Sequence, residues 1–268
     1  MLNRLFIMLL LSTSQIVTAE QVIKIAYLSQ ELKAPAALSN LEPFIKNKGL
    51  QGALLGLKDN NTTGSFTGQS YQLEQKIIPL EGDVQAAFTE LLAAGFQLVV
   101  VNLPAEKLMA LHKINAGKAL LLDVATRDDS LRSQYCLTDT LHLLPSRAMR
   151  ADALAQYMLK RRWNKWFLVV GKTKQDALYA QALKRAAKRF GMKIVAEKTW
   201  QHSYDARRTA QSDIPVFTQG IDYDVLVVAD EQGLFGEYIS YRSWLPRPVI
   251  GTQGLVATAW HRTHEQWG

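Results

Sequence analysis

The feature that most constrains this chain is a regular alternation of short apolar runs with longer amphipathic segments. The apolar runs, such as Val22–Leu28 and Lys165–Val170, are rich in β-branched residues, which is typical of buried strands. The amphipathic segments repeat apolar residues three and four positions apart, as Leu50, Leu54 and Leu57 do, which indicates helices. Strands that alternate with helices at this spacing predict βαβ units, parallel sheets and right-handed crossovers.

The predicted strands fall into two consecutive halves. Those of the first half are Val22–Leu28, Tyr71–Pro79, Gln97–Val101, Leu120–Leu122 and a run near Tyr135–Leu144. Those of the second half are Lys165–Val170, Lys193–Trp200, Asp224–Ala229 and Pro248–Gly251. Each half is large enough for a core of its own. The predicted fold class is therefore α/β, with two doubly wound parallel-sheet lobes, residues 20–144 and 145–268, and a cleft between them.

Several helix ends are indicated by single residues. Asp83 and Ser146 are each followed by a helical apolar pattern, which predicts that they cap helix N-termini. Gly191 follows a basic amphipathic segment and predicts its end. A helix over residues 41–58 is predicted to be broken by the polar run Asp59–Gly64 and by Gly68.

The first 19 residues have the pattern of a secretory signal peptide. Arg4 precedes the apolar run Leu5–Leu11, and Val17–Ala19 ends in small residues that suit a cleavage site. The apolar run is too short to span a bilayer as a helix. We therefore expect residues 1–19 to be removed and the mature protein to be soluble and periplasmic.

Charge and cysteine content exclude several classes of protein. The formal charge of +7 is spread over amphipathic helices, as in Lys184-Arg185 and Lys188-Arg189, which is the ordinary pattern of a solvated helix face. We therefore expect no nucleic-acid partner. Separately, we expect the protein to be a monomer. Cys136 is the single cysteine, so neither an intramolecular disulfide nor a cysteine-based zinc site is possible. It lies in a predicted strand, where a buried small hydrophobe is favoured over a reactive thiol.

Motifs that would indicate catalysis are weak or absent. Gly171-Lys172-Thr173 follows a strand, but the glycine that a phosphate loop needs four residues earlier is missing. His261, His264 and Glu265 could share a helix face, but the sequence shows no third metal ligand of the usual kind. No Gly-x-Ser-x-Gly elbow occurs, and carboxylates are not clustered for acid–base chemistry. We therefore predict no enzyme activity, no catalytic residues, no metal and no cofactor.

Ligands of open parallel sheets bind beyond the carboxyl ends of the strands. Short polar side chains at these predicted ends suit a small polar or anionic ligand, although each could instead cap a helix. The candidate ligand-binding residues are Ser29, Asn102, Ala125, Thr126, Asp230, Glu231 and Gln253. The stretch Lys118–Met149 links the two halves: Asp123–Asp129 is the expected pocket wall of the first lobe, and Leu141–Ser146 the expected first crossing between lobes.

Several segments, taken in their order along the chain, resemble those of a known family. They are Ile23–Ala26, Asp59–Gly64, Ala125–Leu131, Leu144–Ser146 and Pro248–Gly254. The chain resembles the type I periplasmic solute-binding proteins of ABC importers, especially the branched-chain amino acid binders. Within them, Asp123–Arg132, Pro145–Met149 and Lys160–Trp163 look like a subgroup associated with pyrroloquinoline-quinone-dependent alcohol oxidation. The resemblance implies a solute trapped by hinge closure and a closed form that docks on a membrane permease.

The chain also departs from that family. The loop at Ala125 and Thr126, which holds the α-carboxylate in amino-acid binders, is retained, but Gln253 stands where an acidic residue pairs the α-ammonium. A free amino acid is therefore disfavoured unless Asp230 or Glu231 substitutes. The family's final strands are missing, so the sequence is expected to be truncated or naturally short.

Three functions follow from these expectations. The first is the substrate-binding component of an ABC importer. The second is a ligand-sensing or accessory periplasmic protein of an alcohol-oxidation system, not coupled to transport. The third, from a different class, is a hydrolase or a redox partner of a periplasmic dehydrogenase.

Overall fold

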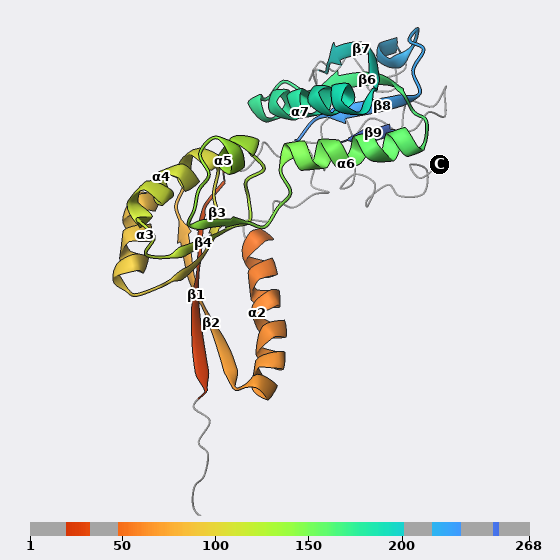
Figure 1. The fold of residues 1–268 in the computed structure, drawn as a ribbon. Helices are drawn as coiled ribbons and strands as arrows, with labels where there is room; N and C mark the ends of the chain where they lie inside the picture. Colours follow the sequence, from red (N-terminus) through yellow and green to blue (C-terminus); the bar gives the residue numbers. More distant parts are fainter. Residues whose placement is uncertain (1–19, 33–47, 201–215, 232–248, 252–268) are drawn as a thin grey trace, which may run out of the picture. The chain divides into compact units, whose positions relative to one another are not determined.

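The structure, a computed structural model, describes residues 20–32, 48–200, 216–231 and 249–251 (Figure 1). The described residues divide into two compact units. Unit 1 runs through Thr126 and includes Ser130–Leu144, and unit 2 contains Arg127–Asp129 and the chain from Pro145 onward. The predicted signal peptide and Gln253 lie outside the described residues.

Unit 1 is a parallel sheet with helices on both faces. Its elements are β1 (Gln21–Gln30), α2 (Lys48–Thr67), β2 (Gln69–Ile78), α3 (Val84–Ala93), β3 (Leu98–Asn102), α4 (Ala105–Asn115), β4 (Leu120–Asp123), α5 (Asp129–Ser133) and β5 (Thr140–His142). The strand order among the described residues is β2-β1-β3-β4-β5, and every pairing is parallel.

Alternation along β1 separates the two faces of this sheet. Ala26 and Leu28 are fully buried in a core that α3 and α4 complete. This core is formed mainly by Phe88, Leu91, Val99, Val101, Leu108, Leu111 and Leu121. Ile25 points to the opposite face, where α2 lies (Figure 1). Because successive side chains of a strand point to opposite faces, α3 and α4 cover one face of the sheet and α2 the other.

Unit 2 is a second parallel sheet. Its elements are α6 (Arg147–Lys160), β6 (Lys165–Val170), α7 (Lys174–Phe190), β7 (Lys193–Thr199), β8 (Val225–Ala229) and β9 (Val249–Gly251). Among the described residues the strand order is β7-β6-β8-β9, again all parallel. Trp166 and Leu168 face α6 and α7, whereas Phe167 and Val169 pack on the other face against Trp200 and nearby aromatic rings. The predicted α/β class with two parallel sheets is confirmed.

The predicted helix caps are present. The Asp83 carboxylate accepts two backbone N–H groups of the first turn of α3, and the Ser146 hydroxyl accepts the N–H of Met149 in α6. Gly191 ends α7 with a φ of 72°, a left-handed conformation that glycine adopts without strain. These ends were predictable because each cap depends on residues within a few positions of the helix end.

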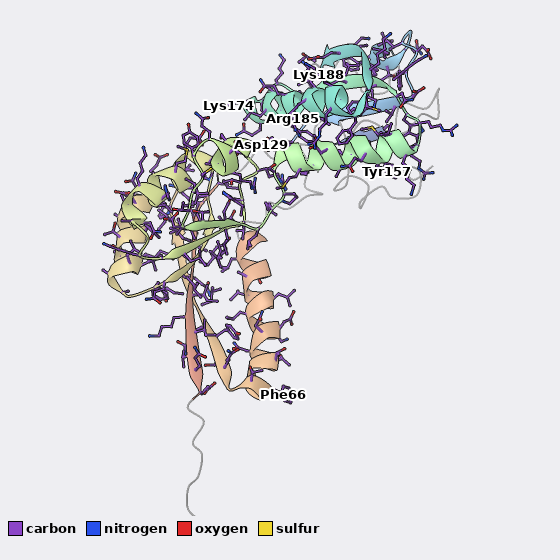
Figure 2. The ribbon with its side chains drawn as sticks, in the orientation of Figure 1. Phe66, Asp129, Tyr157, Lys174, Arg185 and Lys188 are labelled. Atoms are coloured by element: carbon purple, nitrogen blue, oxygen red, sulfur yellow. The ribbon has the colours of Figure 1, made fainter. Side chains whose placement is uncertain are left out.

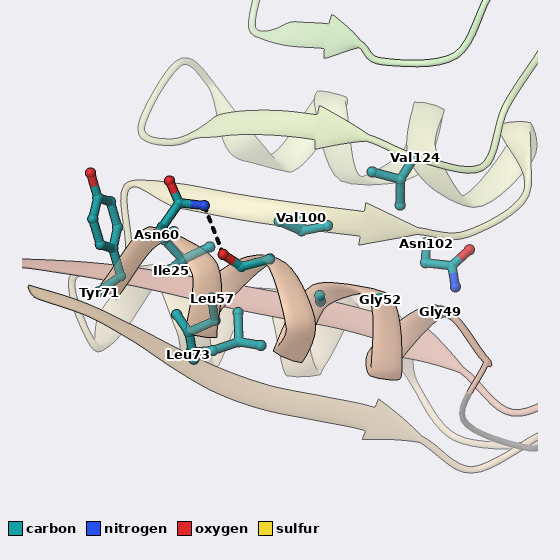
Figure 3. Close-up of a pocket in the computed structure, with 12 residues that line it drawn as sticks. Ile25, Gly49, Gly52, Leu57, Asn60, Tyr71, Leu73, Val100, Asn102 and Val124 are labelled. Atoms are coloured by element: carbon teal, nitrogen blue, oxygen red, sulfur yellow. Dashed lines mark hydrogen bonds between the residues drawn. The ribbon is translucent and has the colours of Figure 1, made fainter. Parts of the chain in front are cut away.

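The prediction that Asp59–Gly64 breaks the preceding helix is wrong, because α2 continues to Thr67 and stops only at Gly68, whose φ is 69°. Polar side chains in this run bond locally instead of opening the helix. The Asn60 amide donates to the carbonyl of Gly56 at 2.7 Å (dashed in Figure 3).

Asn61, in the same polar run, bonds to the neighbouring strand β2. Its side-chain amide donates to the carbonyl of Tyr71 at 3.0 Å and accepts the N–H of Tyr71 at 2.7 Å. One side chain thus satisfies both backbone groups of a residue on β2. The polar side chain of Asn61, which was expected to favour a turn, instead joins the helix to the sheet.

The segment before β5 also differs from prediction. The strand expected near Tyr135–Leu144 is only three residues long, and Cys136 lies outside it in a loop with a φ of 46°. Cys136 is exposed, so the prediction of a buried thiol in a strand is wrong. The strand-like pattern came from Leu137, Leu141, Leu143 and Leu144, but of these four only Leu137 is buried.

Arg127–Asp129 clusters with unit 2, although the predicted first lobe, residues 20–144, includes it. The carbonyl of Arg127 accepts the N–H of Arg147 at 2.9 Å, and the Asp129 carboxylate accepts the N–H of Ala148 at 3.0 Å. Both donors belong to the first turn of α6, whose N–H groups have no partner inside the helix.

None of the helices within the described ranges combines the length and the apolar character needed to cross a membrane.

Candidate functional site

The strands of unit 1 end together at one edge of the sheet. Ser29 of β1 pairs with Asn102 of β3, and Asp123 of β4 pairs with His142 of β5. Two of the predicted site residues, Ser29 and Asn102, are therefore neighbours on adjacent strands. Ala125 and Thr126 follow directly after β4, at the same edge.

The loop after β4 is organised by a buried carboxylate. The Asp123 side chain has no solvent exposure, and its Oδ1 accepts the backbone N–H groups of Ala125 at 3.1 Å and Thr126 at 2.9 Å. Its Oδ2 accepts a short hydrogen bond from the Thr126 hydroxyl. These are the donors that the family resemblance assigns to a ligand carboxylate, and here the chain's own carboxylate holds them.

His142 completes this cluster. Its Nδ1 lies 2.6 Å from Asp123 Oδ2, and its side chain is only 10% exposed. Its Nε2 is buried and has no hydrogen-bond partner among the described residues. In the sequence, Asp123 was expected only to be part of the pocket-wall loop. An aspartate whose side chain accepts the N–H groups two and three residues later forms an Asx-turn, and that pattern could have identified Asp123.

A cavity of about 540 Å³ lies between α2 and the sheet of unit 1 (Figure 3). Residues that line it include Ile25, Leu57, Leu73, Val100, Asn102 and Val124. Its walls are mostly apolar, and the Asn102 amide at its edge donates to the Tyr27 hydroxyl at 2.8 Å. Gly52 and Gly56 of α2 also line it, and a Cβ added at either would meet no atom within 4 Å. Of the predicted site residues that the structure describes, Asn102 alone lines this cavity.

In unit 2, the edge formed by β6 and β8 carries Asp230 and Glu231. Val170 pairs with Ala229 at the ends of these strands, so the residues after each lie side by side. The Asp176 carboxylate of α7 accepts the N–H of Glu231 at 2.7 Å and that of Thr173 at 2.9 Å. A carboxylate thus occupies the N-terminus of α7, which agrees with the rejection of a phosphate loop at Gly171-Lys172-Thr173.

The Glu231 carboxylate is paired with two arginines. Arg147 donates to its Oε2 at 3.1 Å, and Arg150 Nη1 lies 3.7 Å from its Oε1. Arg147 is 4% exposed and also lies 3.2 Å from Asp128. Neither arginine was predicted to bind a ligand, because both belong to a helix with an ordinary amphipathic pattern.

Tyr179 of α7 lies beside one of these two arginines, Arg150. The Arg150 guanidinium carbon is 5.2 Å from the centre of its ring, and its hydroxyl is buried without a hydrogen-bond partner in the described part of the chain. Burial raises the pKa of Tyr179 to about 12. Burial also lowers the pKa of Arg127, helped by repulsion from Arg150 and Arg147.

The described residues contain no group of three or more His, Cys, Asp or Glu side chains placed to hold a metal ion. Gln253 lies outside the described ranges, so its predicted role stays a prediction.

Comparison with known proteins gives structural neighbours only. No family model matches the sequence, and a search of curated proteins finds no match. A Desulfitobacterium hafniense ABC transporter substrate-binding protein, in complex with Leu, is 17% identical at a TM-score of 0.62, over 89% of this chain and 68% of that one. A Streptococcus pneumoniae branched-chain amino acid transporter substrate-binding protein, in complex with isoleucine, is also 17% identical at 0.62, over 92% and 69%.

A third neighbour is a branched-chain amino acid ABC transporter periplasmic ligand-binding protein from Burkholderia xenovorans. It is 16% identical at a TM-score of 0.67, over 89% of this chain and 63% of that one. The chain thus spans about two thirds of the length of these proteins. None of the three is described as part of an alcohol-oxidation system, so that alternative gains no support. The chain has the α/β fold of the type I periplasmic substrate-binding proteins.

Proposed function

We propose that this protein is the periplasmic substrate-binding component of an ABC importer and captures a small polar solute without converting it. The observation that carries the proposal is the fold, two parallel-sheet units that match solved transporter substrate-binding proteins over most of this chain. In each unit, polar and charged side chains gather where the strands end, which is where ligands of such sheets bind.

Export and partners belong to the same proposal. The signal-like residues 1–19 support transfer to the periplasm, and the lobe boundary is placed between Leu144 and Pro145. The partner is the permease of the importer, and the binding protein is a monomer.

The proposed contacts are Ser29, Asn102, Ala125, Thr126, Asp230, Glu231 and Gln253. In unit 1 the Thr126 donors already serve Asp123, so a ligand group there must accept from them jointly with that carboxylate or displace it. An anionic group would be repelled by Asp123, so a neutral polar group of the solute suits this loop better.

The experiment is a thermal-shift screen of the purified chain against amino acids, carboxylates, alcohols and aldehydes. A ligand at 100 times its dissociation constant adds about 2.7 kcal/mol to the free energy of unfolding. For the solute found, Thr126→Ala should reduce that gain. The matched control is Thr89→Ala on α3, where a hydroxyl that only bonds back to Gln85 is removed. Equal gains in both variants would remove Thr126 from the site.

Transport needs a separate measurement. Cells that carry the protein with its permease should accumulate the labelled solute, and cells that lack the protein should not. Turnover of any screened ester or alcohol by the purified protein would contradict a binding-only function.

A further inference from the structure

We infer that unit 2 contains an anion-binding subsite, formed by the guanidinium groups of Arg147 and Arg150 and the hydroxyl of Tyr179. The solute of the proposed importer is then a small organic anion without an ammonium group. This inference rests on the proposed function and reverses the arrangement that the family resemblance implies, in which the loop at Thr126 holds the anionic end.

The first support is a set of buried donors whose hydrogen bonds are incomplete. Nε of Arg147 and the Tyr179 hydroxyl are buried and have no hydrogen-bond partner among the described residues. Nη1 of Arg147 and Nη1 of Arg150 are buried and make no hydrogen bond there, although they lie in ion pairs with Asp128 at 3.2 Å and with Glu231 at 3.7 Å. Arg147 is 4% exposed and Tyr179 has no exposure. Unmade hydrogen bonds of this kind are costly, above all for charged groups. A carboxylate or phosphate supplies the acceptor oxygens that guanidinium groups bind most strongly.

The second support is the crowding of positive charge. The backbone of Arg127 bonds to that of Arg147, and the guanidinium groups of Arg147 and Arg150 meet at one carboxylate, Glu231. Among the described residues, Asp128 lies 3.2 Å from Arg147. The Asp176 carboxylate does not pair with these arginines in the structure, because it accepts two backbone N–H groups. An additional anion would relieve the repulsion among the arginines.

The third support concerns the ammonium group of an amino acid. An ammonium group that paired with Glu231 would compete with Arg147 and Arg150 for the carboxylate that pairs with both of them. In unit 1, the Asp123 carboxylate is likewise committed to Thr126, Ala125 and His142. The cluster therefore favours a carboxylate that lacks the α-ammonium, such as a simple or 2-oxo acid.

The test uses matched probes with the branched side chain of leucine, measured by isothermal titration on the full chain. They are 4-methylpentanoate, 4-methyl-2-oxopentanoate, the neutral 4-methylpentanamide and zwitterionic L-leucine. We expect at least one of the two acids to bind about tenfold or more tightly than the amide and leucine. Inorganic phosphate forms a further arm: if it binds more tightly than either acid, the anion is a phosphate and not a carboxylate.

Arg150→Gln should weaken binding of the anion by about tenfold or more, Arg150→Lys by less, and Tyr179→Phe about threefold. The control is Arg185→Gln on α7 (labelled in Figure 2), which makes the same change of charge in the same unit. The Arg185 guanidinium is half exposed and bonds to Asp152 at 2.6 Å. Unfolding curves of all variants show whether each one folds. If Arg150→Gln does not fold, Tyr179→Phe, which removes a single oxygen atom, still tests the subsite.

The outcomes separate the two proposals. If leucine or the amide binds as tightly as the acids, or if Arg150→Gln and Tyr179→Phe leave anion binding unchanged, the subsite is overturned while the importer function stands. If anions bind but permease-dependent uptake does not occur, the subsite stands and the importer function falls. If no probe binds at concentrations up to about 10 mM and the wider screen finds no solute, both fall.

Discussion

A single buried carboxylate sets the chemistry of the loop after β4. Asp123 takes up the backbone and hydroxyl donors of Thr126 and pairs with His142, so the loop presents no ready-made anion site. Each hydrogen bond to a charged group of this kind contributes about 1.5–3 kcal/mol to the stability of the folded protein. Thr126 lies directly after β4, but its donors already serve Asp123, so its predicted contact with a ligand stays a prediction.

A second carboxylate that carries several hydrogen bonds belongs to Asp139, directly before β5. Asp139 lies 2.5 Å from Nδ1 of His112 and accepts hydrogen bonds from the amide of Asn115 and the hydroxyl of Thr140. Burial alone would raise the pKa of this carboxyl group, but the bonds from Asn115 and His112 outweigh it and hold the pKa below the ordinary value of 3.8.

This shift predicts a contribution to stability that depends on pH. Because the folded pKa lies below the unfolded one, the contribution is fully present above pH 3.8 and declines as the pH falls from there through the folded pKa. The difference in unfolding free energy between the native chain and Asp139→Asn should shrink as the pH falls below about 4. Urea titrations at several pH values below about 5 measure it; a difference that grows on acidification in that range would refute the assignment.

At the scale of elements, helix α2 shows how tertiary bonds override local signals. Its glycines have different surroundings: Gly56 faces open space in the cavity, whereas a Cβ at Gly64 would lie 2.2 Å from the carbonyl oxygen of Gln69. Glycine inside a helix is about 1 kcal/mol less favourable than alanine. Close packing against Gln69 leaves no room for a side chain at Gly64, whereas nothing within 4 Å requires glycine at Gly56.

We therefore predict opposite effects of the same substitution within one helix. Gly56→Ala should raise the unfolding free energy by about 0.5–1 kcal/mol, because it removes the helix penalty and meets no atom. Gly64→Ala should lower it by more than about 1 kcal/mol, because the backbone of Gln69 must move. Chemical denaturation of the two variants checks this, and equal signs would show that the helix lies differently on the sheet.

The helix ends were the most predictable elements because their signals are local. Ser146, Asp83 and Gly191 act on backbone groups within a few residues, so sequence alone placed them. The loop that contains Cys136 was not predictable in this way. Whether an apolar residue there is buried depends on which strand it reaches, and β5 pairs with β4 over only three residues.

At the scale of the whole molecule, each unit has a core of its own. Leu108 is fully buried in the core between α3, α4 and the sheet of unit 1, and Leu183 is fully buried in the core between α6, α7 and the sheet of unit 2. Two cores that share no residue can lose stability separately.

Leu108→Ala and Leu183→Ala should each cost about 2–5 kcal/mol, in different places. Hydrogen exchange should accelerate mainly over unit 1 in the first variant and mainly over unit 2 in the second. Mass spectrometry of peptides from both units measures this. Equal acceleration in both units for either variant would show that the protein unfolds as one cooperative body.

The sequence by itself determined the alternation of strands and helices, and hence two parallel α/β sheets with polar residues at their carboxyl edges. Those properties follow from periodicity and from caps, which act over a few residues. Only the tertiary structure decided which polar groups remain available to a ligand. Asp123 occupies the Thr126 donors, and the arginines of α6 meet Tyr179 and Glu231 from separate elements, because hydrogen bonds and burial depend on neighbours that the sequence does not place side by side.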